Sequence, residues 1–477
     1  MTSPFPHTPS FKGYNAPSRI EADIFDLEIE GTLPADLNGD WYRMTPDPQY
    51  PPRLGDDFFI SGDGMISRFR FDRGHVDFRS RYVHTERFLA ERKARRGLFG
   101  AYRNPFTDDP SVRTVDRTVA NTSPLWHGGR LVTMKEDGRP YEIDPETLET
   151  RGRFDWHGKL RSHTVSAHPK VDPRTGELLF YGYEVDAIAS RMMAYCVADR
   201  DGRLVREDWF EAPYPAMVHD FAITRDYVVF PLFPTLVDLE RLKAGGPHWM
   251  SDVSRDAYIG VMPRNGSVGQ IRWFRRRGGQ AFHVINAWNE GATLHLDLCL
   301  AEMNPFPYIP DVSGAPYDPA RSSAKPVRFT MELGKSSDGI QERTLGEIGG
   351  DVPRINEQFT GRRYRYTYMG MVDATRPMPF AGPVGPGFNQ VGRFDVESGE
   401  VDAWYGSDSV TYQEPQFVSR GNGEAEGYVL CVFERHHDQL SDVGVFDAQH
   451  IGRGPLALVR LPLRLRSGIH GTWITRA

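Results

Sequence analysis

Strand-sized runs joined by tight polar turns recur along the whole chain, and this pattern constrains the fold more than any other feature. Clear examples are MISRFRFDRGHVDFRSRYV from Met65, HPKVDPRTGELLFYGYE from His168, VINAWNEGATLHLDL from Val284 and GRFDVESGEVDAWYG from Gly392. The turns carry the Gly, Asn and Asp residues that hairpins need, and the flanks are rich in Val, Tyr and Phe. The sequence therefore predicts an all-β protein.

The hairpins are spread over all 477 residues with no evident linker between them. Length alone would allow two or three domains, but one closed array of strands can also run this long. A β-propeller removes exposed edge strands in this way, whereas a sandwich rarely needs so many strands. A propeller is favoured over a large barrel. The blades of such a propeller would repeat in three-dimensional structure and not in sequence, because no WD or kelch signature is present.

The segment ERFLAERKARRGLFG, from Glu86 to Gly100, is the clearest helical candidate. It is charged and moderately amphipathic, so it predicts a helix over residues 86–100. A surface helix packed on the β-array is the simpler interpretation. An element at the entrance of a site is the functional alternative.

Composition excludes some classes of function. A net charge of −7 gives no sign of a phosphate-binding surface, which argues against a nucleic-acid partner. Cys196, Cys299 and Cys431 are too few and too scattered for a disulfide framework. The first twenty residues lack the apolar core of a secretory signal, and no apolar run approaches the roughly 20 residues of a membrane span. We expect a cytoplasmic protein without stable membrane insertion, either a monomer or a homodimer.

Four of the fifteen histidines lie in similar surroundings, each beside an apolar, strand-like run: His168, His219, His283 and His470. In a propeller, inner strands of different blades line one axis, so histidines on four such strands can meet. Imidazoles bind Zn, Cu, Fe and Ni, and nearby carboxylates would balance the charge and fix the ring tautomers. A single histidine beside an apolar run is more often a core residue, so spacing alone does not select these four.

The segments around these histidines resemble the carotenoid cleavage oxygenase family, and within it the bacterial lignostilbene dioxygenases and isoeugenol monooxygenases. The resemblance runs from about Arg19 to Trp473 and includes GDGMISRF, SAHPKVDPRTGE, VHDFAIT, FHVINAWNEG, QEPQFVSR and LPLRLRSGIHGTW. It implies a seven-bladed β-propeller with a few helices and loops capping the active-site face. Residues 1–477 would form a single catalytic domain with a short N-terminal extension, about residues 1–18.

The resemblance also implies Fe(II) held by His168, His219, His283 and His470, with three carboxylates orienting the rings. Glu136 in KEDG and Glu414 in QEPQF match two of these carboxylates. Asp351, in GGDVPRIN, stands where the family usually has glutamate. Because aspartate is one methylene shorter, we expect either a water bridge to its histidine or a ligand that is held less firmly.

In the stilbene- and isoeugenol-cleaving branch, a tyrosine and a lysine bind the 4-hydroxyl group of the substrate, and Tyr102 and Lys135 match them. An ammonium beside a phenol favours the phenolate, which donates electron density to the conjugated alkene. Without the resemblance, the sequence around Lys135 would predict a surface residue in a hairpin turn. Three phenylalanines in matching segments are candidates to sandwich the ring, although buried phenylalanines are commonly just core: Phe59, Phe282 and Phe306.

The sequence thus predicts a non-haem Fe(II) oxygenase. It would use O2 to split the side-chain double bond of a small phenolic alkene such as resveratrol, lignostilbene or isoeugenol. The products would be a 4-hydroxybenzaldehyde such as vanillin and a second aldehyde. An apocarotenoid-cleaving dioxygenase is the alternative within the family. Outside it, the alternatives are a non-catalytic propeller scaffold and a calcium-dependent lactonase, whose site would need oxygen ligands rather than histidines.

Overall fold

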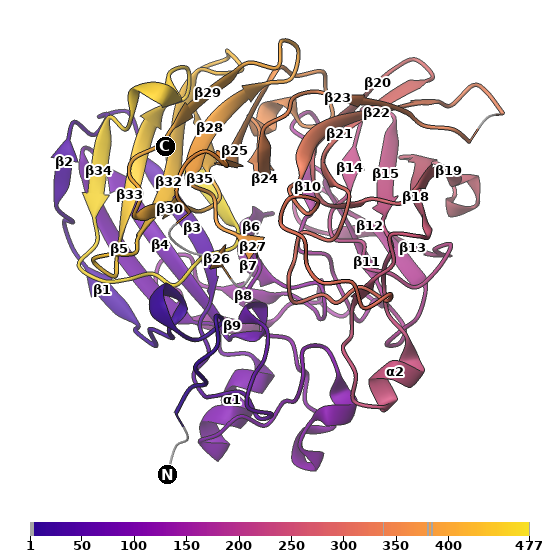
Figure 1. Cartoon of the computed structure of the whole chain (residues 1–477), viewed down its shortest axis with the longest axis horizontal. Coiled ribbons are helices and arrows are strands. Elements are labelled where there is room, and N and C mark those ends of the chain that lie inside the picture. Colours follow the sequence, from indigo (N-terminus) through magenta and orange to yellow (C-terminus); the bar gives the residue numbers. More distant parts are fainter. Residues whose placement is uncertain (1–3, 337, 379–380, 383–384, 477) are drawn as a thin grey trace.

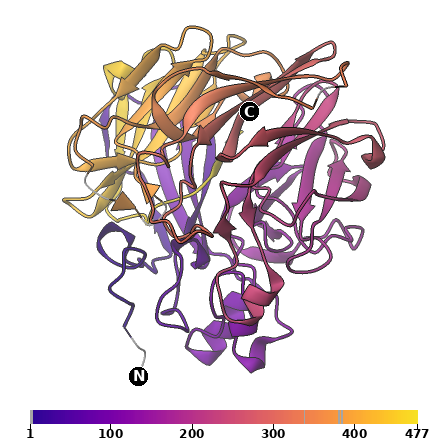
Figure 2. The same ribbon diagram turned by 45° about the vertical axis from the view of Figure 1, so that its right-hand side comes forward.

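The computed structural model describes residues 4–336, 338–378, 381–382 and 385–476, and its larger sheets form seven blades around a central axis (Figures 1 and 2). The prediction of an all-β, seven-bladed propeller is confirmed. Each blade is an antiparallel sheet, as expected for strands joined by hairpins.

Blades 1 to 4 are built mainly from residues 22–277, and the C-terminal β35 completes blade 1. Blade 1 consists of β1 (Ala22–Ile24), β5 (His75–Tyr82), β4 (Gly64–Asp72), β3 (Gly39–Pro46) and β35 (Gly471–Thr475). Blade 2 consists of β6 (Ser123–His127), β7 (Arg130–Met134), β8 (Tyr141–Ile143) and β9 (Thr150–Arg153). Blade 3 consists of β10 (Lys170–Val171), β11 (Leu178–Tyr183), β12 (Met192–Ala198) and β13 (Leu204–Glu211). Blade 4 consists of β14 (Ala222–Ile223), β15 (Tyr227–Leu232), β18 (Asp256–Pro263) and β19 (Arg272–Arg277).

Blades 5 to 7 complete the ring. Blade 5 consists of β20 (Gln280–Glu290), β21 (Thr293–Ala301), β22 (Lys325–Glu332) and β23 (Gln341–Thr344). Blade 6 consists of β24 (Gly349–Arg354), β25 (Tyr366–Val372), β28 (Gln390–Asp395) and β29 (Val401–Trp404). Blade 7 consists of β2 (Ile29–Gly31), β34 (Ala457–Arg460), β33 (Leu440–Asp447), β32 (Gly427–Arg435), β30 (Val410–Tyr412) and β31 (Gln416–Ser419). Two small ribbons pair β16 (Thr235–Leu236) with β17 (Met250–Ser251) and β26 (Ala381–Gly382) with β27 (Gly385–Pro386).

Both ends of the chain close the ring. The C-terminal β35 pairs with β3 in blade 1, and the N-terminal β2 pairs with β34 in blade 7. Two blades are therefore built from segments at opposite ends of the sequence. Pairing these edges removes strands that would otherwise be exposed. The inner strands of neighbouring blades contact one another near the axis, as β6 and β35, β14 and β20, and β20 and β24 do, so residues at or just before the starts of these strands can face one another from different blades.

The helix predicted over residues 86–100 is shorter than expected. In the structure α1 spans Glu86–Ala94, and Thr85 caps its start by accepting a hydrogen bond from the Phe88 N–H at 3.1 Å. Arg95 adopts a left-handed conformation, with φ of 55°, and ends the helix. The buried Glu91 carboxylate then accepts the N–H groups of Leu98 and Phe99 at 2.8 and 3.2 Å. The helix thus anchors the loop that follows it.

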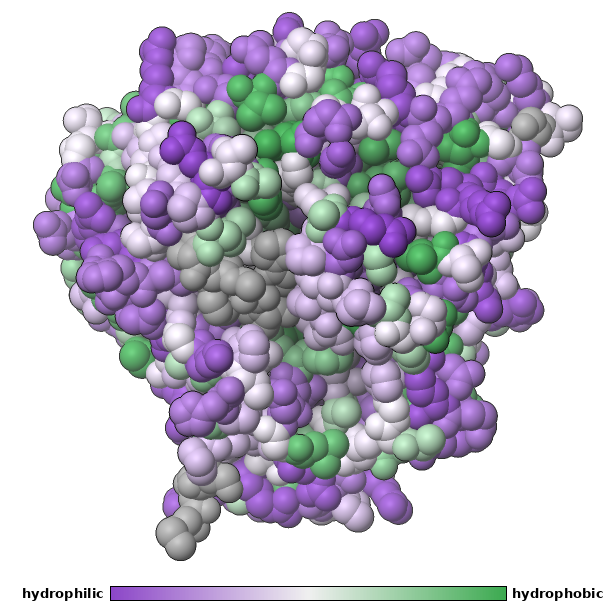
Figure 3. Space-filling view, in the orientation of Figure 1, coloured by the Kyte–Doolittle hydropathy of each residue, from purple (hydrophilic) through white to green (hydrophobic). Residues whose placement is uncertain are grey.

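The remaining helical elements are short. They are α2 (Leu239–Lys243) and the 3₁₀ turns η1 (Gly13–Asn15), η2 (Phe59–Ser61), η3 (Pro105–Thr107), η4 (Pro110–Val112), η5 (Val268–Gln270), η6 (Glu357–Phe359) and η7 (Ile451–Arg453). The two α-helices lie on the same side of the molecule (Figure 1). The face seen in Figure 3 is mostly hydrophilic, with apolar residues in scattered groups. Among the described residues, no helix has the length and apolar character needed to span a membrane.

Candidate metal centre

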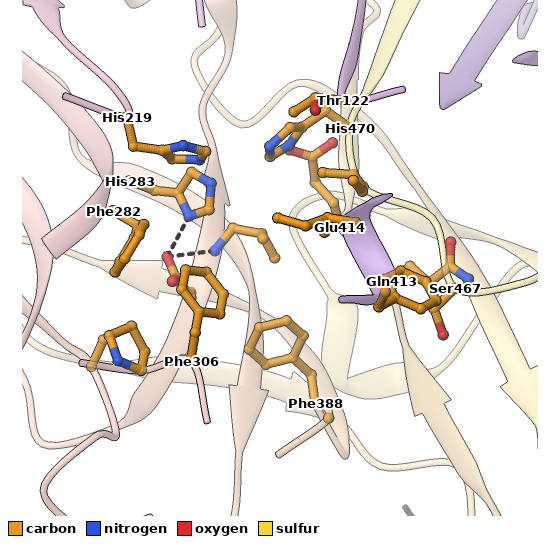
Figure 4. Close-up of a pocket in the computed structure, with 18 of the residues that line it drawn as sticks. Thr122, His219, Phe282, His283, Phe306, Phe388, Gln413, Glu414, Ser467 and His470 are labelled. Carbon is orange, nitrogen blue, oxygen red and sulfur yellow. Dashed lines mark hydrogen bonds and ion pairs between the residues drawn. The ribbon is translucent and has the colours of Figure 1, made fainter. Parts of the chain in front are cut away.

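Four histidines from four blades meet on the propeller axis. His168 lies two residues before β10, His219 lies three residues before β14, His283 lies in β20, and His470 directly precedes β35. One ring nitrogen from each lies within 4.8 Å of the others. His168 Nε2 and His219 Nε2 are 3.1 Å apart. The structure thus brings together all four residues that the sequence pointed to, and Figure 4 shows three of them, His219, His283 and His470, around one point.

Three of these imidazoles are oriented by carboxylates. His219 Nδ1 lies 3.1 Å from Glu136 Oε1, His283 Nδ1 lies 2.9 Å from Asp351 Oδ1, and His470 Nδ1 lies 2.8 Å from Glu414 Oε1. With Nδ1 donating to a carboxylate, the Nε2 lone pair is directed at the centre. For His168, no carboxylate partner is found among the residues that the structure describes.

Asp351 reaches its histidine directly, so the expected water bridge is not needed. The ladder between β24 and β25 shifts register between Asp351 and Arg354, and Val352 has a φ of 52°. Such a bulge re-aims side chains, and a β-branched residue rarely adopts this conformation. The Val352 N–H also donates to Asp351 Oδ1 at 2.8 Å. Local backbone geometry therefore compensates for the shorter side chain.

The carboxylates have further partners that keep them ionised. Glu414 Oε2 accepts the Gly471 N–H at 2.9 Å, and Glu136 Oε2 accepts the Tyr183 hydroxyl at 2.7 Å. Burial alone would raise the pKa of Glu414, but the charges of Arg354 and His470 outweigh it and lower that pKa to about 2. Burial is outweighed in the same way at Glu136, where His219 lowers the carboxyl pKa below its ordinary value. The anionic charge needed beside a divalent cation is already present.

The donor set fits a metal ion. His283 Nε2 and His470 Nε2 are buried and have no hydrogen-bond partner within the described part of the chain. Buried polar atoms are normally satisfied, so two unpaired lone pairs directed at one point need an explanation. A cation bound by the four imidazoles provides it, and Fe(II) is among the ions that imidazole suits.

A cavity adjoins the histidines, and all five predicted substrate residues line it: Phe59, Tyr102, Lys135, Phe282 and Phe306. Lys135 is buried, so it is not the surface residue that its turn-like context would allow. Its Nζ donates to Ile60 O at 2.6 Å and to Asn121 Oδ1 at 3.2 Å, and lies 5.2 Å from the centroid of the Tyr102 ring.

Charge and aromatic rings define this end of the cavity. Burial lowers the pKa of Lys135 to about 8 and raises the pKa of Tyr102 well above its ordinary value. The Phe282 ring packs edge-on against Phe306, with centroids 4.3 Å apart, and lies 5.6 Å from His219. An apolar slot containing a few polar groups is typical of a site for a small aromatic ligand.

Several lining residues were not predicted. Thr122 directly precedes β6, the inner strand of blade 2. The four histidines lie at or just before the inner strands of other blades, so the strand pattern could have pointed to Thr122 as a lining residue. Tyr308 follows Phe306 closely in the sequence. Trp249, which follows the loop after α2, and Gln413 and Glu434 of blade 7 reach the cavity only through the tertiary fold. No motif in the sequence marks Trp249 or Glu434, whereas Gln413 directly precedes Glu414 in the QEPQF segment.

Comparisons with known proteins agree with this geometry. The family model described as retinal pigment epithelial membrane protein matches residues 15–475. Isoeugenol monooxygenase of Pseudomonas nitroreducens is 45% identical over 98% of both chains, and lignostilbene-α,β-dioxygenase isozyme III of Sphingomonas paucimobilis is 41% identical over 98% of this chain and 97% of that one. The crystal structure of Pseudomonas brassicacearum lignostilbene dioxygenase superimposes with a TM-score of 0.96 and 41% identity over the full length of both chains. A seven-bladed fold, four axial histidines and these full-length similarities place the chain in the carotenoid cleavage oxygenase family of non-haem iron oxygenases, to which it belongs.

Proposed function

We propose that this protein is an Fe(II)-dependent oxygenase that cleaves the side-chain double bond of 4-hydroxyphenyl alkenes. Hydroxystilbenes such as resveratrol or lignostilbene and phenylpropenes such as isoeugenol are the expected substrates. Cleavage with O2 gives a 4-hydroxybenzaldehyde, such as vanillin, and a second aldehyde. The names of the relatives support the reaction class.

One observation carries the choice of substrate: a buried lysine and tyrosine lie at one end of the cavity that the histidines line. Lys135 has two neutral oxygen partners, and an ammonium has three donors, so one N–H is left for a ligand oxygen. The raised pKa of Tyr102 keeps its hydroxyl protonated, and this group can donate to the same oxygen. A bound phenolate would supply the negative charge that Lys135 lacks.

His168, His219, His283 and His470 would hold the iron, and Glu136, Asp351 and Glu414 orient three of them. Bound Fe(II) supplies the activation of O2. The protein contributes binding and orientation. Lys135 lowers the pKa of the bound phenol, so the ring carries a phenolate that enriches the conjugated alkene in electron density. Phe282 and Phe306 confine the ring in an apolar slot beside His219 and exclude water.

The test is to load the purified protein with Fe(II) without air, then add isoeugenol or resveratrol with O2 and identify the products by mass. We expect a 4-hydroxybenzaldehyde from resveratrol and vanillin from isoeugenol. His219→Ala should abolish cleavage. Lys135→Met should lower kcat/KM about 100-fold, the scale of a lost proton-handling group.

A matched control is Lys243→Met, because this lysine lies on α2 with a side chain 48% exposed. Its kcat/KM should equal that of the unaltered protein. Full iron loading without cleavage of either compound would refute the phenolic substrate and favour an apocarotenoid. Activity retained in Lys135→Met would refute the phenolate role.

A further inference from the structure

The cavity beside the histidines has a second end that the reaction at the phenol does not use. Figure 4 shows Gln413 and Ser467 on the opposite side of the pocket from Phe282 and Phe306. Residues 411–414 and 467–470 line this second end. These two segments end at Glu414 and His470, which are hydrogen-bonded at 2.8 Å. The second end is therefore continuous with the metal centre.

A buried carboxylate with polar partners lines this end. Glu434 Oε2 accepts the Thr411 hydroxyl at 2.7 Å, and Glu434 Oε1 accepts the Gln413 side-chain N–H at 2.8 Å. These three side chains are between 1% and 6% exposed, and all line the cavity. A carboxylate can accept about four hydrogen bonds. His436 Nε2 lies 3.8 Å from Glu434 Oε2, which is within ion-pair range but too long for a hydrogen bond, so Glu434 can still accept one from a ligand.

A guanidinium behind this group is incompletely satisfied. Arg43, which is 1% exposed, donates from Nη1 to Gln413 Oε1, but its Nε and Nη2 have no partner among the described residues. Leaving such donors unpaired in the interior costs free energy. The Gln413 amide thus links a buried cation to the buried Glu434 anion at the wall of the cavity.

Gly468 lets this polar group approach the cavity. A Cβ at this position would lie 2.7 Å from Gln413 Oε1 and 3.0 Å from Arg43 Nη2, closer than real side chains pack. Because Gly468 has no side chain, Gln413 Oε1 and Arg43 Nη2 can lie close to its backbone at the edge of the cavity. Phe388 and Tyr412, joined by a β-bridge, add aromatic surface at the same end.

We infer that Glu434, Thr411 and Gln413, which Arg43 supports from behind, form a second subsite that binds hydroxyl groups on the far half of an elongated substrate. The inference rests on the proposed function and narrows it. A substrate that places a hydroxylated second aryl ring there donates to Glu434 between aromatic walls. The short methyl end of a phenylpropene makes no such bond. A site built to bind a hydroxyl discriminates strongly against analogues that lack it. The preferred class is therefore the polyhydroxylated stilbenes.

The experiment compares kcat/KM for three alkenes on the Fe(II)-loaded protein: resveratrol, 4-hydroxystilbene with an unsubstituted second ring, and isoeugenol. We expect resveratrol to exceed 4-hydroxystilbene by at least about tenfold, the scale of a charge-assisted hydrogen bond. Glu434→Gln keeps the shape of the side chain and removes its charge, so it should reduce that ratio to about twofold or less. Thr411→Val, a second variant, should reduce it in part.

Glu347→Gln is the matched control, because its side chain is 81% exposed; its ratio should be that of the unaltered protein. Equal values for the two stilbenes, or an unchanged ratio in a folded Glu434→Gln protein, would overturn the second subsite. Cleavage of isoeugenol without cleavage of either stilbene would overturn it as well and leave the proposed function intact. Failure with all three alkenes at full iron loading would instead refute the proposed function.

Discussion

The metal centre and the phenol-binding end of the cavity treat buried charge in opposite ways. At the metal centre, three imidazoles have carboxylate partners at 2.8–3.1 Å. At the phenol end, the hydrogen-bond partners of the Lys135 ammonium among the described residues are the neutral oxygens of Ile60 and Asn121. One region supplies its counter-charges from the protein. The other leaves its cation without a hydrogen-bonded anion, although the carboxylates of Asp137 and Glu136 act on it from a greater distance.

This difference shows in the pKa values. Opposite charges lower the pKa of Glu414 to about 2 in spite of burial, so its ionised form is favoured in the fold. Burial without a bonded anion lowers the pKa of Lys135 to about 8, so its charged form is disfavoured there. The metal centre is preorganised for a cation because its carboxylates are already ionised. The phenol-binding end is suited to a substrate that brings its own negative charge, a phenolate, to Lys135.

The largest effect is expected at the metal centre, when one of the carboxylates that orient the histidines is replaced. Glu414→Gln removes the charge beside His470 and leaves one oxygen for two donors, His470 Nδ1–H and the Gly471 N–H, so the ring orientation is no longer fixed. We expect Fe(II) affinity to fall about 100-fold, measured by anaerobic competition with a chelator. Glu397→Gln, with a side chain 44% exposed, is the control. Unchanged affinity would mean that the carboxylates do not organise the centre.

The pH dependence of activity tests the role of the Lys135 charge at the phenol-binding end of the cavity. The Lys135 charge is present below its pKa of about 8 and is lost as the pH rises through that value. We therefore expect kcat/KM to fall about tenfold for each pH unit above 8. In Lys135→Arg, the guanidinium stays charged, so the decline should move to higher pH. The same decline in both proteins would assign it to another group.

The charge states at the two sites could not be read from the sequence, whereas much of the framework could. Strand and turn patterns predicted the all-β class, and the family resemblance supplied the seven blades and the four histidines. Pairing of β2 with β34 was beyond local patterns, because it joins segments from opposite ends of the chain. Glu434 was missed for the same reason, since a cavity wall is a tertiary property.

The free energy of unfolding tests whether the buried charge of Lys135 is left uncompensated, unlike the charges at the metal centre. The folded pKa of Lys135 lies below that of the unfolded chain, so its charge costs folding free energy below pH 8, and the cost fades as the pH rises further. Lys135→Met removes that cost but leaves Ile60 O and Asn121 Oδ1 without their donor. We expect a net gain of about 1 kcal/mol at neutral pH, measured by urea unfolding, alongside the loss of activity. A loss of stability would mean that the ammonium is fully compensated in the fold.

The smallest effect concerns the carboxylate that departs from the family pattern. Asp351→Glu restores the usual residue, yet the bulge at Val352 already brings the shorter side chain to 2.9 Å from His283 Nδ1. An extra methylene must then fit beside the buried Cys299, whose thiol contacts Asp351. Overpacking of this kind displaces side chains, so we expect Fe(II) affinity to fall about threefold in the same chelator competition. Asp351→Asn, which keeps the size and removes the charge, separates packing from electrostatics. If Asp351→Glu instead bound iron more tightly, the short carboxylate would be a weak support, and the metal centre would be less complete than its distances indicate.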